Sequence, residues 1–559
     1  MWTLKHRFAA AATKPKAGLL SQRCRQFADN NRCRSFVIIK RPFRATSVVQ
    51  QTTNQHRYSS KANHQRHPSL LTNGGTIEGV WIFFRHGDRA PSRPLSPAHM
   101  IGAEAEFWIQ RMPKPDSMAA FEAFSQFYPP DIHPSNDGQF LDVRRAPFGF
   151  LTHTGLEQTR ENGVRLFNRY NNHGHHLPDR QNYDTAKDFL DAWDVKVYST
   201  NYLRTIMSVQ SFLDGLFATK CYKSLVERMK NNNHPHLRHT VADMRIPNHY
   251  SVPKPFSKEA LIRVQVRGRD QDTLNAFDRN PDLMADLVSE VISSPEFQER
   301  DGAAAPLAAR LANILPGLAR KKKNTHGFNA APSGINWIEA TDHFVCRRAH
   351  NVPFSRFSDF EHDDRIEQTL EGLSHQTTAH LAWRFRQWYK SPRLLAAIAA
   401  PPLREIAEQL MVAPALAETE KRPFTIYSCH DVTILALLYG MGAEFLAGDT
   451  KGGWRFWPAY ASTLVFELVR IDDDSSCTDW EHSHVMRILL NGRPILSVDL
   501  HNNYWQGPGT YVGHGPMNML LAHDFDNIVT KLERAGGYDH PLSAEDYSKK
   551  RDMSNWTPV

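Results

Sequence analysis

The stretch FFRHGDRAPSR, residues 83–93, places a histidine between two arginines directly after an apolar run. Guanidinium groups present planar forks of donors that match the oxygens of a phosphate group. The charges of Arg85 and Arg89 disfavour protonation of His86 and are expected to lower its pKa from about 6.5. A neutral imidazole nitrogen in this position can attack phosphorus and form a phosphohistidine.

A structural role is the alternative explanation for the charged residues of this motif. Three charged residues alone would be explained by a surface salt-bridge cluster, whereas a seven-residue pattern at the end of a predicted strand favours phosphate chemistry. Within the motif, Gly87 is expected to let the backbone approach the ligand closely.

Three stretches share one pattern, a short β-prone run followed by polar residues and a helical run. The runs are GVWIFF at 79–84, VKVY at 195–198 and FTIYS at 424–428. The helix after the second carries apolar residues at helical spacing, namely Leu203, Ile206, Val209, Leu213 and Leu216. After the third, Asp431 is expected at the N-cap, with Gly440 and Gly442 where the helix stops.

Repeated strand–loop–helix units predict an α/β fold, with a parallel-type central sheet flanked by helices. Polar residues at the carboxyl ends of such strands converge on one crevice, so the three polar stretches are expected to be neighbours. A further helix is predicted after Phe150, where Thr154 and Glu157 form a capping-box pattern.

Residues 93–149 and 221–420 are rich in amphipathic helical patterns and are predicted to be helical insertions that form a cap domain. The predicted organisation is a presequence, a linker, a main domain with a three-part core, and a C-terminal segment. These comprise residues 1–58, 59–75, 76–505 (core 76–92, 150–220 and 421–505) and 506–559, respectively.

The motif RHGxRxP, read here as residues 85–91, resembles the signature of the histidine acid phosphatases, branch 2 of the histidine phosphatase superfamily. Other segments resemble that family in the same order between about residues 76 and 505. They are GFLTHTG at 149–155, STNYLRT with Arg204, YSCHDVT with His430 and Asp431, and YASTLVFEL at 460–468.

The resemblance implies a phosphomonoesterase that works through a phosphohistidine intermediate. It implies that His86 is the nucleophile and Asp431 the proton donor to the leaving oxygen, a role that a carboxylic acid suits. The resemblance assigns phosphate binding to four further residues, Arg85, Arg89, Arg204 and His430. No cofactor or metal is expected, because arginines neutralise the charge that Mg²⁺ neutralises elsewhere.

Other candidate ligand clusters are explained more simply as surface features. Two histidine-rich stretches, at 173–176 and 234–239, lack a nearby carboxylate, and the basic run at 320–323 is typical of a solvated loop. The six cysteines show no CxxC spacing, so neither a zinc site nor a disulfide framework is indicated.

The net charge of +8 belongs to the N-terminus. Residues 1–60 hold 12 Lys and Arg and one acid, Asp29, which leaves 55 basic and 58 acidic residues and a net charge of −3 elsewhere. This distribution argues against a nucleic-acid partner. The acid-poor, arginine-containing N-terminus is typical of a mitochondrial presequence, with a plastid transit peptide as the alternative. No run of about 18 apolar residues predicts a transmembrane helix.

The substrate is the most open question. The stretches HDVT, RRAHNVP (347–353) and LIRVQVRGRDQDT (261–273) resemble a mitochondrial group of the family that converts lysophosphatidic acid to monoacylglycerol. Aromatic and methionine residues after the first motif could line an acyl channel or simply form the core of the insertion; they are Phe107, Trp108, Met112, Met118, Phe121, Phe124, Phe127 and Tyr128. The alternative is a broad-specificity acid phosphatase acting on sugar or other small phosphate esters. The sequence does not predict an oligomeric state.

Overall fold

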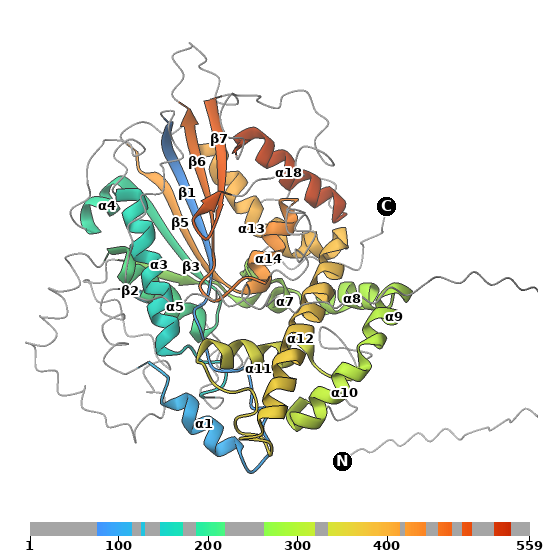
Figure 1. Ribbon diagram of the computed structural model, residues 1–559. Helices are drawn as coiled ribbons and strands as arrows, with labels where there is room; N and C mark the ends of the chain where they lie inside the picture. Colours follow the sequence, from blue (N-terminus) through green and yellow to red (C-terminus); the bar gives the residue numbers. More distant parts are fainter. Residues whose placement is uncertain are drawn as a thin grey trace, which may run out of the picture. The chain divides into compact units, whose positions relative to one another are not determined.

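The computed structural model describes ten stretches of the chain, all of them within one of two units, residues 70–559 (Figure 1). These stretches are residues 75–113, 125–128, 146–171, 186–217, 262–318, 334–413, 420–442, 457–471, 483–494 and 519–537.

Nine strands in these stretches form one sheet in the order β2-β4-β3-β5-β1-β6-β7-β8, and β9 also pairs with β7. Their bounds are β1 Gly75–Arg85, β2 Ser125–Tyr128, β3 Trp193–Ser199, β4 Ile262–Val266, β5 Arg422–Cys429, β6 Thr463–Ile471, β7 His484–Leu490, β8 Arg493–Pro494 and β9 Met519–Leu521.

The five strands from β2 to β1 pair in parallel, which confirms the predicted α/β fold. From β6 onward the pairing is antiparallel, so the sheet is mixed. The strand expected in YASTLVFEL is β6, and it lies beside β1 in the middle of the sheet.

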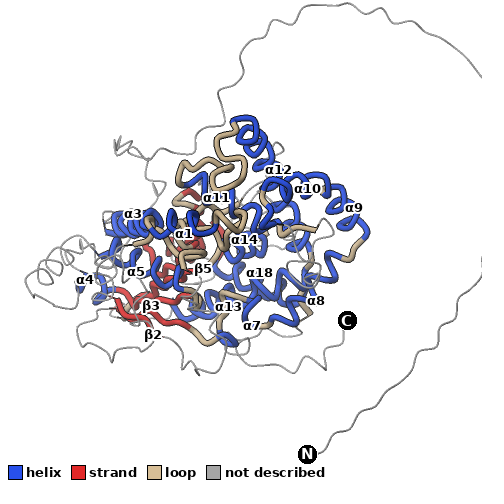
Figure 2. Tube along the Cα trace, turned by 90° about the horizontal axis from the view of Figure 1, so that it is seen from below, coloured by secondary structure: helices blue, strands red, loops and turns tan. Residues whose placement is uncertain are grey.

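Strand β1 is buried on both faces, which its unbroken apolar run allows. Val80, Ile82 and Phe84 face α3 (His153–Asn171) and α5 (Leu203–Phe217). The alternate residues Trp81 and Phe83 face the other side. That side is covered by α13 (Pro392–Val412), α14 (Asp431–Gly440) and α18 (Ala522–Ala535), so helices flank both faces of the sheet (Figures 1 and 2).

The remaining helices come mostly from the second insertion. They are α1 Ile101–Ile109, α4 Ala186–Ala192, α7 Ala276–Arg279, α8 Pro281–Ile292, α9 Pro295–Ala303, α10 Ala305–Ile314, α11 Trp337–Ala349 and α12 Asp364–Lys390, with short 3₁₀ turns at Arg269–Gln271 and Pro316–Leu318. The apolar faces of α8, α10, α11 and α12 join the same buried cluster as α13 and α14.

The prediction of purely helical insertions is wrong in two places. Strand β4 lies in the second insertion, where Ile262, Val264 and Val266 are buried at the two-residue period of a strand. Strand β2 lies in the first insertion and pairs with β4. The C-terminal segment also contributes to the fold, because α18 buries Phe525 and Val529 against the sheet side that α13 covers.

Two predicted helix starts need correction by one or two residues. Helix α3 begins at His153, and the hydroxyl of Thr152 rather than Thr154 accepts the N–H of Gly155 at 3.1 Å. Helix α14 has His430 at its N-cap and Asp431 as its first residue. Its predicted end is confirmed, because the helix stops at Gly440 and Gly442 has a positive φ of 72°.

The predicted apolar face of α5 is confirmed, since its five predicted positions are buried. Among the described residues, no helix is both long enough and apolar enough to span a membrane. The histidine-rich stretches, the basic run at 320–323 and the proposed presequence lie outside the described residues.

Helices α3 and α5 approach so closely that glycine is required on both. A Cβ at position 215 would lie 1.9 Å from the carbonyl oxygen of Arg160, and one at 163 would lie 2.1 Å from that of Phe212. We therefore expect Gly215→Ala to force the helices apart and to lower the free energy of unfolding by about 1–3 kcal/mol or more. Urea unfolding followed by circular dichroism measures this loss.

Gly302→Ala in α9 is the matched control, because a Cβ there meets nothing within 4 Å. This change should be neutral or stabilising by up to about 1 kcal/mol, since alanine is the better helix former. Equal effects of the two substitutions would contradict the close-contact explanation.

Candidate active site

The ends of three parallel strands lie at the same level of the sheet. Ser428 of β5 pairs with Phe84 of β1 on one side and with Ser199 of β3 on the other. The residues that follow therefore meet at one edge, as the sequence pattern predicted. They are the stretches 85–93, 200–204 and 429–431, and together they contain all six predicted site residues.

His86 is buried and its ring is oriented by one hydrogen bond. Its Nδ1 lies 2.8 Å from the carbonyl oxygen of Gly87. Because a carbonyl only accepts, Nδ1 carries the hydrogen, and in the neutral ring Nε2 keeps its lone pair. Nε2 has no hydrogen-bond partner within the described part of the chain, so it is the free nitrogen of the ring.

His86 is held neutral by its surroundings, as the sequence predicted. Burial lowers the pKa of His86 well below its ordinary value, and the positive charges of Arg204, Arg85 and Arg89 lower it further. Burial is the largest of these causes, whereas the sequence argument had named only the charges. An unprotonated nitrogen is the form that can act as a nucleophile.

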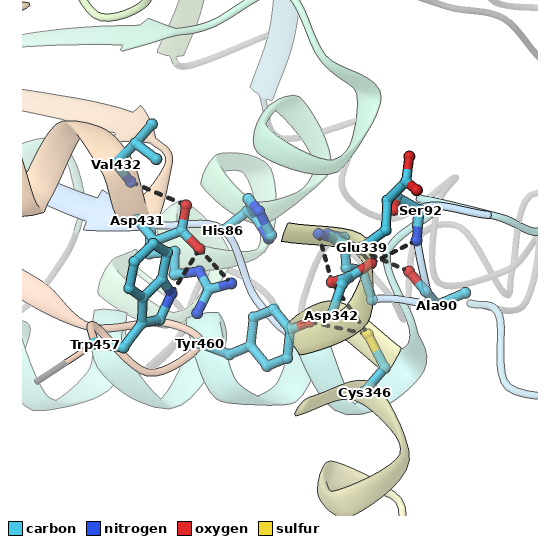
Figure 3. A network of polar contacts seen from close by, with 12 residues as sticks. His86, Ala90, Ser92, Glu339, Asp342, Cys346, Asp431, Val432, Trp457 and Tyr460 are labelled. Carbon is cyan, nitrogen blue, oxygen red and sulfur yellow. Dashed lines mark hydrogen bonds and ion pairs between the residues drawn. The ribbon is translucent and has the colours of Figure 1, made fainter. Parts of the chain in front are cut away.

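Arg85 and Asp431 form an ion pair, and Figure 3 shows Asp431 at one side of His86. Arg85 Nη2 lies 2.8 Å from Asp431 Oδ2, and its Nη1 donates to the carbonyl of Pro458 at 2.6 Å. Trp457 Nε1 donates to the same Oδ2 at 3.0 Å, and Oδ1 accepts the N–H of Val432 at 2.9 Å. Oδ2 thus has two of these contacts and Oδ1 has one.

Two tyrosine rings support arginines of the site. The guanidinium of Arg85 lies 4.2 Å from the ring centre of Tyr460, and that of Arg204 lies 4.4 Å from the ring centre of Tyr202. Such cation–π contacts contribute about 0.5–2 kcal/mol each. Tyr202 is itself fixed by a 2.7 Å hydrogen bond from its hydroxyl to Asp278.

Arg204, the second residue of α5, has no ion-pair partner in the described part of the chain. Burial and the charge of Arg89 lower the pKa of Arg204 to about 10, so it remains a cation at neutral pH. Its Nε is buried without a hydrogen-bond partner. An anion is the ligand that such a group favours.

His430 packs edge-on against His86, with ring centres 5.6 Å apart. Its Nε2 lies 3.1 Å from the hydroxyl of Thr200, which leaves Nδ1 available to a ligand. Burial, followed by Arg204, Arg89 and Arg85, lowers the pKa of His430 well below its ordinary value. A bound anion would raise this pKa, because a negative charge favours the imidazolium.

Arg89 is the predicted site residue whose setting differs most from expectation. Its Nη1 and Nη2 lie 2.9 and 2.8 Å from the two carboxylate oxygens of Asp342, which belongs to α11. The carboxylate raises the pKa of Arg89 well above its ordinary value, although burial opposes this. Arg89 is thus a firmly held cation, and its Nε has no partner.

The structure shows a reason for Gly87 that the sequence analysis had not given. A Cβ at position 87 would lie 2.1 Å from the carbonyl oxygen of Gly155, and one at 155 would lie 2.2 Å from that of Asp88. The close approach is thus between two protein segments, residues 86–90 and 150–155, which also pair at Arg89 and Leu151. The GFLTHTG stretch serves to hold the first motif in place.

Asp88 is the anchor between these segments. Its Oδ2 lies 2.5 Å from both the hydroxyl of Thr152 and Nε2 of His350. Because Thr152 also caps α3, a single hydroxyl joins the helix start to the motif. Asp88 itself is completely buried.

The structure thus brings together all six predicted residues, and their arrangement suits a phosphate group. Three cations and the neutral imidazole of His430 lie around His86, which has one free nitrogen, and a carboxyl group lies at the side. The described residues contain no group of three or more potential metal ligands.

Several contributors were missed by the sequence analysis, among them Asp342, Trp457, Tyr460, Tyr202 and His350. Tyr202, Tyr460 and His350 lie in stretches that had been singled out, but nothing in the sequence pointed to Asp342 or Trp457. These residues reach the site only through tertiary contacts.

The aromatic residues proposed for an acyl channel are part of the core where the structure describes them. Phe107 and Trp108 are buried in a cluster with Ala90, Cys346 and Val352. Met112 packs against a second cluster near Leu151. Three of the others lie outside the described residues, and so do the side chains of the last two; they are Met118, Phe121, Phe124, Phe127 and Tyr128.

Comparison with known families gives one match over most of the chain. The family described as histidine phosphatase superfamily (branch 2) matches residues 76–491. Lysophosphatidic acid phosphatase type 6 of Bos taurus is 23% identical over 435 residues, which cover 72% of this chain and 79% of the bovine protein. The Homo sapiens protein of the same name is 22% identical over 408 residues, 70% and 73% of the two chains.

Two solved structures align with most of the chain at low identity. The multiple inositol polyphosphate phosphatase of Bifidobacterium longum, solved with phosphate, gives a TM-score of 0.46 at 12% identity and covers 84% of this chain and 94% of its own. The phytase of Hafnia alvei gives 0.42 at 14% identity, covering 83% and 98%.

The two neutral imidazoles make stability depend on pH. In the unfolded chain histidine binds a proton as pH falls below about 6.5, whereas folded His86 and His430, with lowered pKa values, do not. Stability is therefore unaffected above about pH 6.5 and falls below it, by up to about 1.4 kcal/mol per pH unit for each group. Urea unfolding of wild type and His430→Gln at pH 7.5, 6.5 and 5.5 should give a shallower fall for the variant.

His153→Gln is the control, because this side chain is 58% exposed. It should keep the wild-type slope. Inorganic phosphate should also flatten the wild-type slope, since a bound anion raises the pKa of both imidazoles. Identical slopes for wild type and His430→Gln would contradict a neutral His430.

Proposed function

This chain belongs to branch 2 of the histidine phosphatase superfamily and is a phosphoric monoester hydrolase, and we propose that its reaction passes through a phosphohistidine at His86. The observation that carries the proposal is the state of the His86 ring. Its Nδ1–H is engaged by Gly87, its pKa is lowered by burial and three arginines, and its Nε2 is free.

The first step forms a bond between His86 Nε2 and phosphorus and breaks the bond to the ester oxygen. Arg85, Arg89 and Arg204 hold the other phosphoryl oxygens and neutralise their charge, with His430 Nδ1 as a further partner. Asp431 gives its proton to the leaving oxygen, since an alkoxide is a poor leaving group. The products of this step are the alcohol and phosphohistidine.

The second step uses water. Asp431, now ionised, accepts a proton from the water molecule whose oxygen attacks phosphorus, and the bond from phosphorus to Nε2 breaks. Inorganic phosphate leaves, and His86 is again a neutral imidazole. The ion pair with Arg85 and the hydrogen bond from Trp457 keep the carboxyl group at the side of His86 in both steps.

We propose lysophosphatidic acid as the substrate, with monoacylglycerol as the product. Two observations support this choice, namely the short stretches that resemble the lysophosphatidic acid phosphatase group and the relatives of that name. The presequence-like N-terminus agrees with a mitochondrial location, which we propose with it. The second candidate is hydrolysis of small soluble esters, which is favoured by the finding that Phe107 and Trp108 are core residues.

A substrate panel tests the proposed function. Phosphate release by the full chain would be measured on lysophosphatidate, a sugar phosphate, phytate and an aromatic phosphate. We expect the highest kcat/KM on lysophosphatidate, and we expect His86→Ala to lower kcat by at least about a thousandfold on every ester, since the nucleophile is lost.

Each outcome of the panel has a separate meaning. A kcat/KM on the soluble esters that equals or exceeds that on lysophosphatidate would not contradict the mechanism. It would favour a broad-specificity acid phosphatase. Activity retained by His86→Ala, with an unchanged melting temperature, would remove His86 as the nucleophile.

The proton-donor role of Asp431 is tested by leaving-group dependence. Asp431→Asn should lower kcat/KM, which reports the step that forms the phosphohistidine, about 10²–10³-fold for an alkyl phosphate, whose leaving oxygen needs a proton. For p-nitrophenyl phosphate the loss should be less than about tenfold, because that leaving group departs without one. Equal losses on the two esters would contradict this role.

A further inference from the structure

Helix α11 carries a polar face that runs along the loop 86–93. Glu339, Asp342 and Cys346 are spaced at i, i+3 and i+7, and the C-cap residue His350 continues the same row. Residues at this spacing lie on one side of a helix. The helix belongs to the second insertion, far in sequence from the strand ends that build the site.

This face holds the loop at three successive places (Figure 3 shows the central part). His350 Nε2 lies 2.5 Å from Asp88 Oδ2. Asp342 pairs with Arg89 and also accepts the N–H of Ser92 at 2.7 Å. Glu339 forms an ion pair with Arg93, one turn of helix away.

Asp342 is the member of this face that reaches a phosphate-binding group. Its side chain is 7% exposed and that of Arg89 12%, so the pair is shielded from water. Burial raises the pKa of Asp342, but Arg89 and the N–H of Ser92 outweigh this and lower it, so the carboxylate is ionised. Both terminal nitrogens of Arg89 are engaged by it.

The three arginines therefore differ in how much positive charge they offer. Arg204 has no ion-pair partner in the described part of the chain. Arg85 has the proposed proton donor as its partner, at one of its two terminal nitrogens. Among these three, only Arg89 has both terminal nitrogens paired with one carboxylate, that of Asp342, which transfers no proton in the proposed reaction.

We propose that Asp342 is a positioning residue that fixes the fork of Arg89 and offsets its charge, so that phosphate can leave the site after each turnover. The inference rests on the proposed function, because it takes Arg89 to bind the phosphoryl group. Without Asp342, Arg89 would present its full charge and both terminal nitrogens to phosphate. The product would then bind more tightly and leave more slowly.

The sign of one measurement separates this role from a purely structural one. Damage to the loop weakens phosphate binding, whereas relief of the competition for Arg89 strengthens it. For Asp342→Asn we expect the inhibition constant Ki of inorganic phosphate to fall about tenfold, since a unit negative charge next to the site is removed. We also expect kcat to fall, with KM falling alongside it, because product release is slowed and Arg89 is less well fixed.

The experiment is steady-state kinetics of the full chain on a soluble aryl phosphate, with inorganic phosphate as the inhibitor. Glu339→Gln is the matched control, because it removes the same charge from the same helix face but its partner is Arg93. Its Ki should stay within about twofold of wild type. Asp342→Ser, which also removes the charge, should repeat the fall in Ki and serves if the asparagine variant does not fold.

Two results would overturn the inference. A Ki that stays constant or rises in both Asp342 variants would show that the carboxylate does not compete for Arg89. An equal fall in Glu339→Gln would assign the effect to the charge of the helix as a whole.

Failure of the proposed function would look different. Wild type would then release no phosphate above the His86→Ala blank, whatever the Asp342 variants do. If the wild type is active, the Ki values test only the role of Asp342 and not the proposed function.

Discussion

The mutual repulsion of buried positive charges is the constraint on which the site depends. The positive charges of Arg85, Arg89 and Arg204 act on two buried imidazoles, and each lowers the pKa of both rings. The protein offsets this repulsion unequally, with carboxylates at two arginines and tyrosine rings under two. What remains is a site that favours an anion and keeps a neutral nucleophile ready for it.

The fold meets this constraint by drawing on separate regions of the chain. Parallel strands β1, β3 and β5 end at one level and deliver the arginines and imidazoles. A helix from an insertion then fixes the loop after β1 from outside, through Asp88 and Arg89. Gly87 and Gly155 let the loop lie against the start of α3, which leaves its position little freedom.

The family resemblance supplied Arg204, His430 and Asp431, whereas local patterns predicted the parallel strands β1, β3 and β5 and the convergence of the polar stretches that follow them. A β-prone run followed by polar residues marks a strand end, and all such ends face the same crevice. Asp342 could not be predicted this way, since its partner lies 253 residues away in sequence and its helix resembles any amphipathic helix. Strands β2 and β4 were not predicted for a similar reason, because they are short strands among helical patterns.

The pairing of β1 has a consequence for how the protein folds. The strand that carries the nucleophile lies between β5 and β6, which the ribosome makes more than three hundred residues later. This apolar strand therefore lacks both of its pairing partners until most of the chain has been synthesised. Contacts between residues so distant in sequence make folding slow, and a partly folded intermediate then exposes apolar surface that can aggregate. We therefore expect this chain to rely on chaperones while it folds.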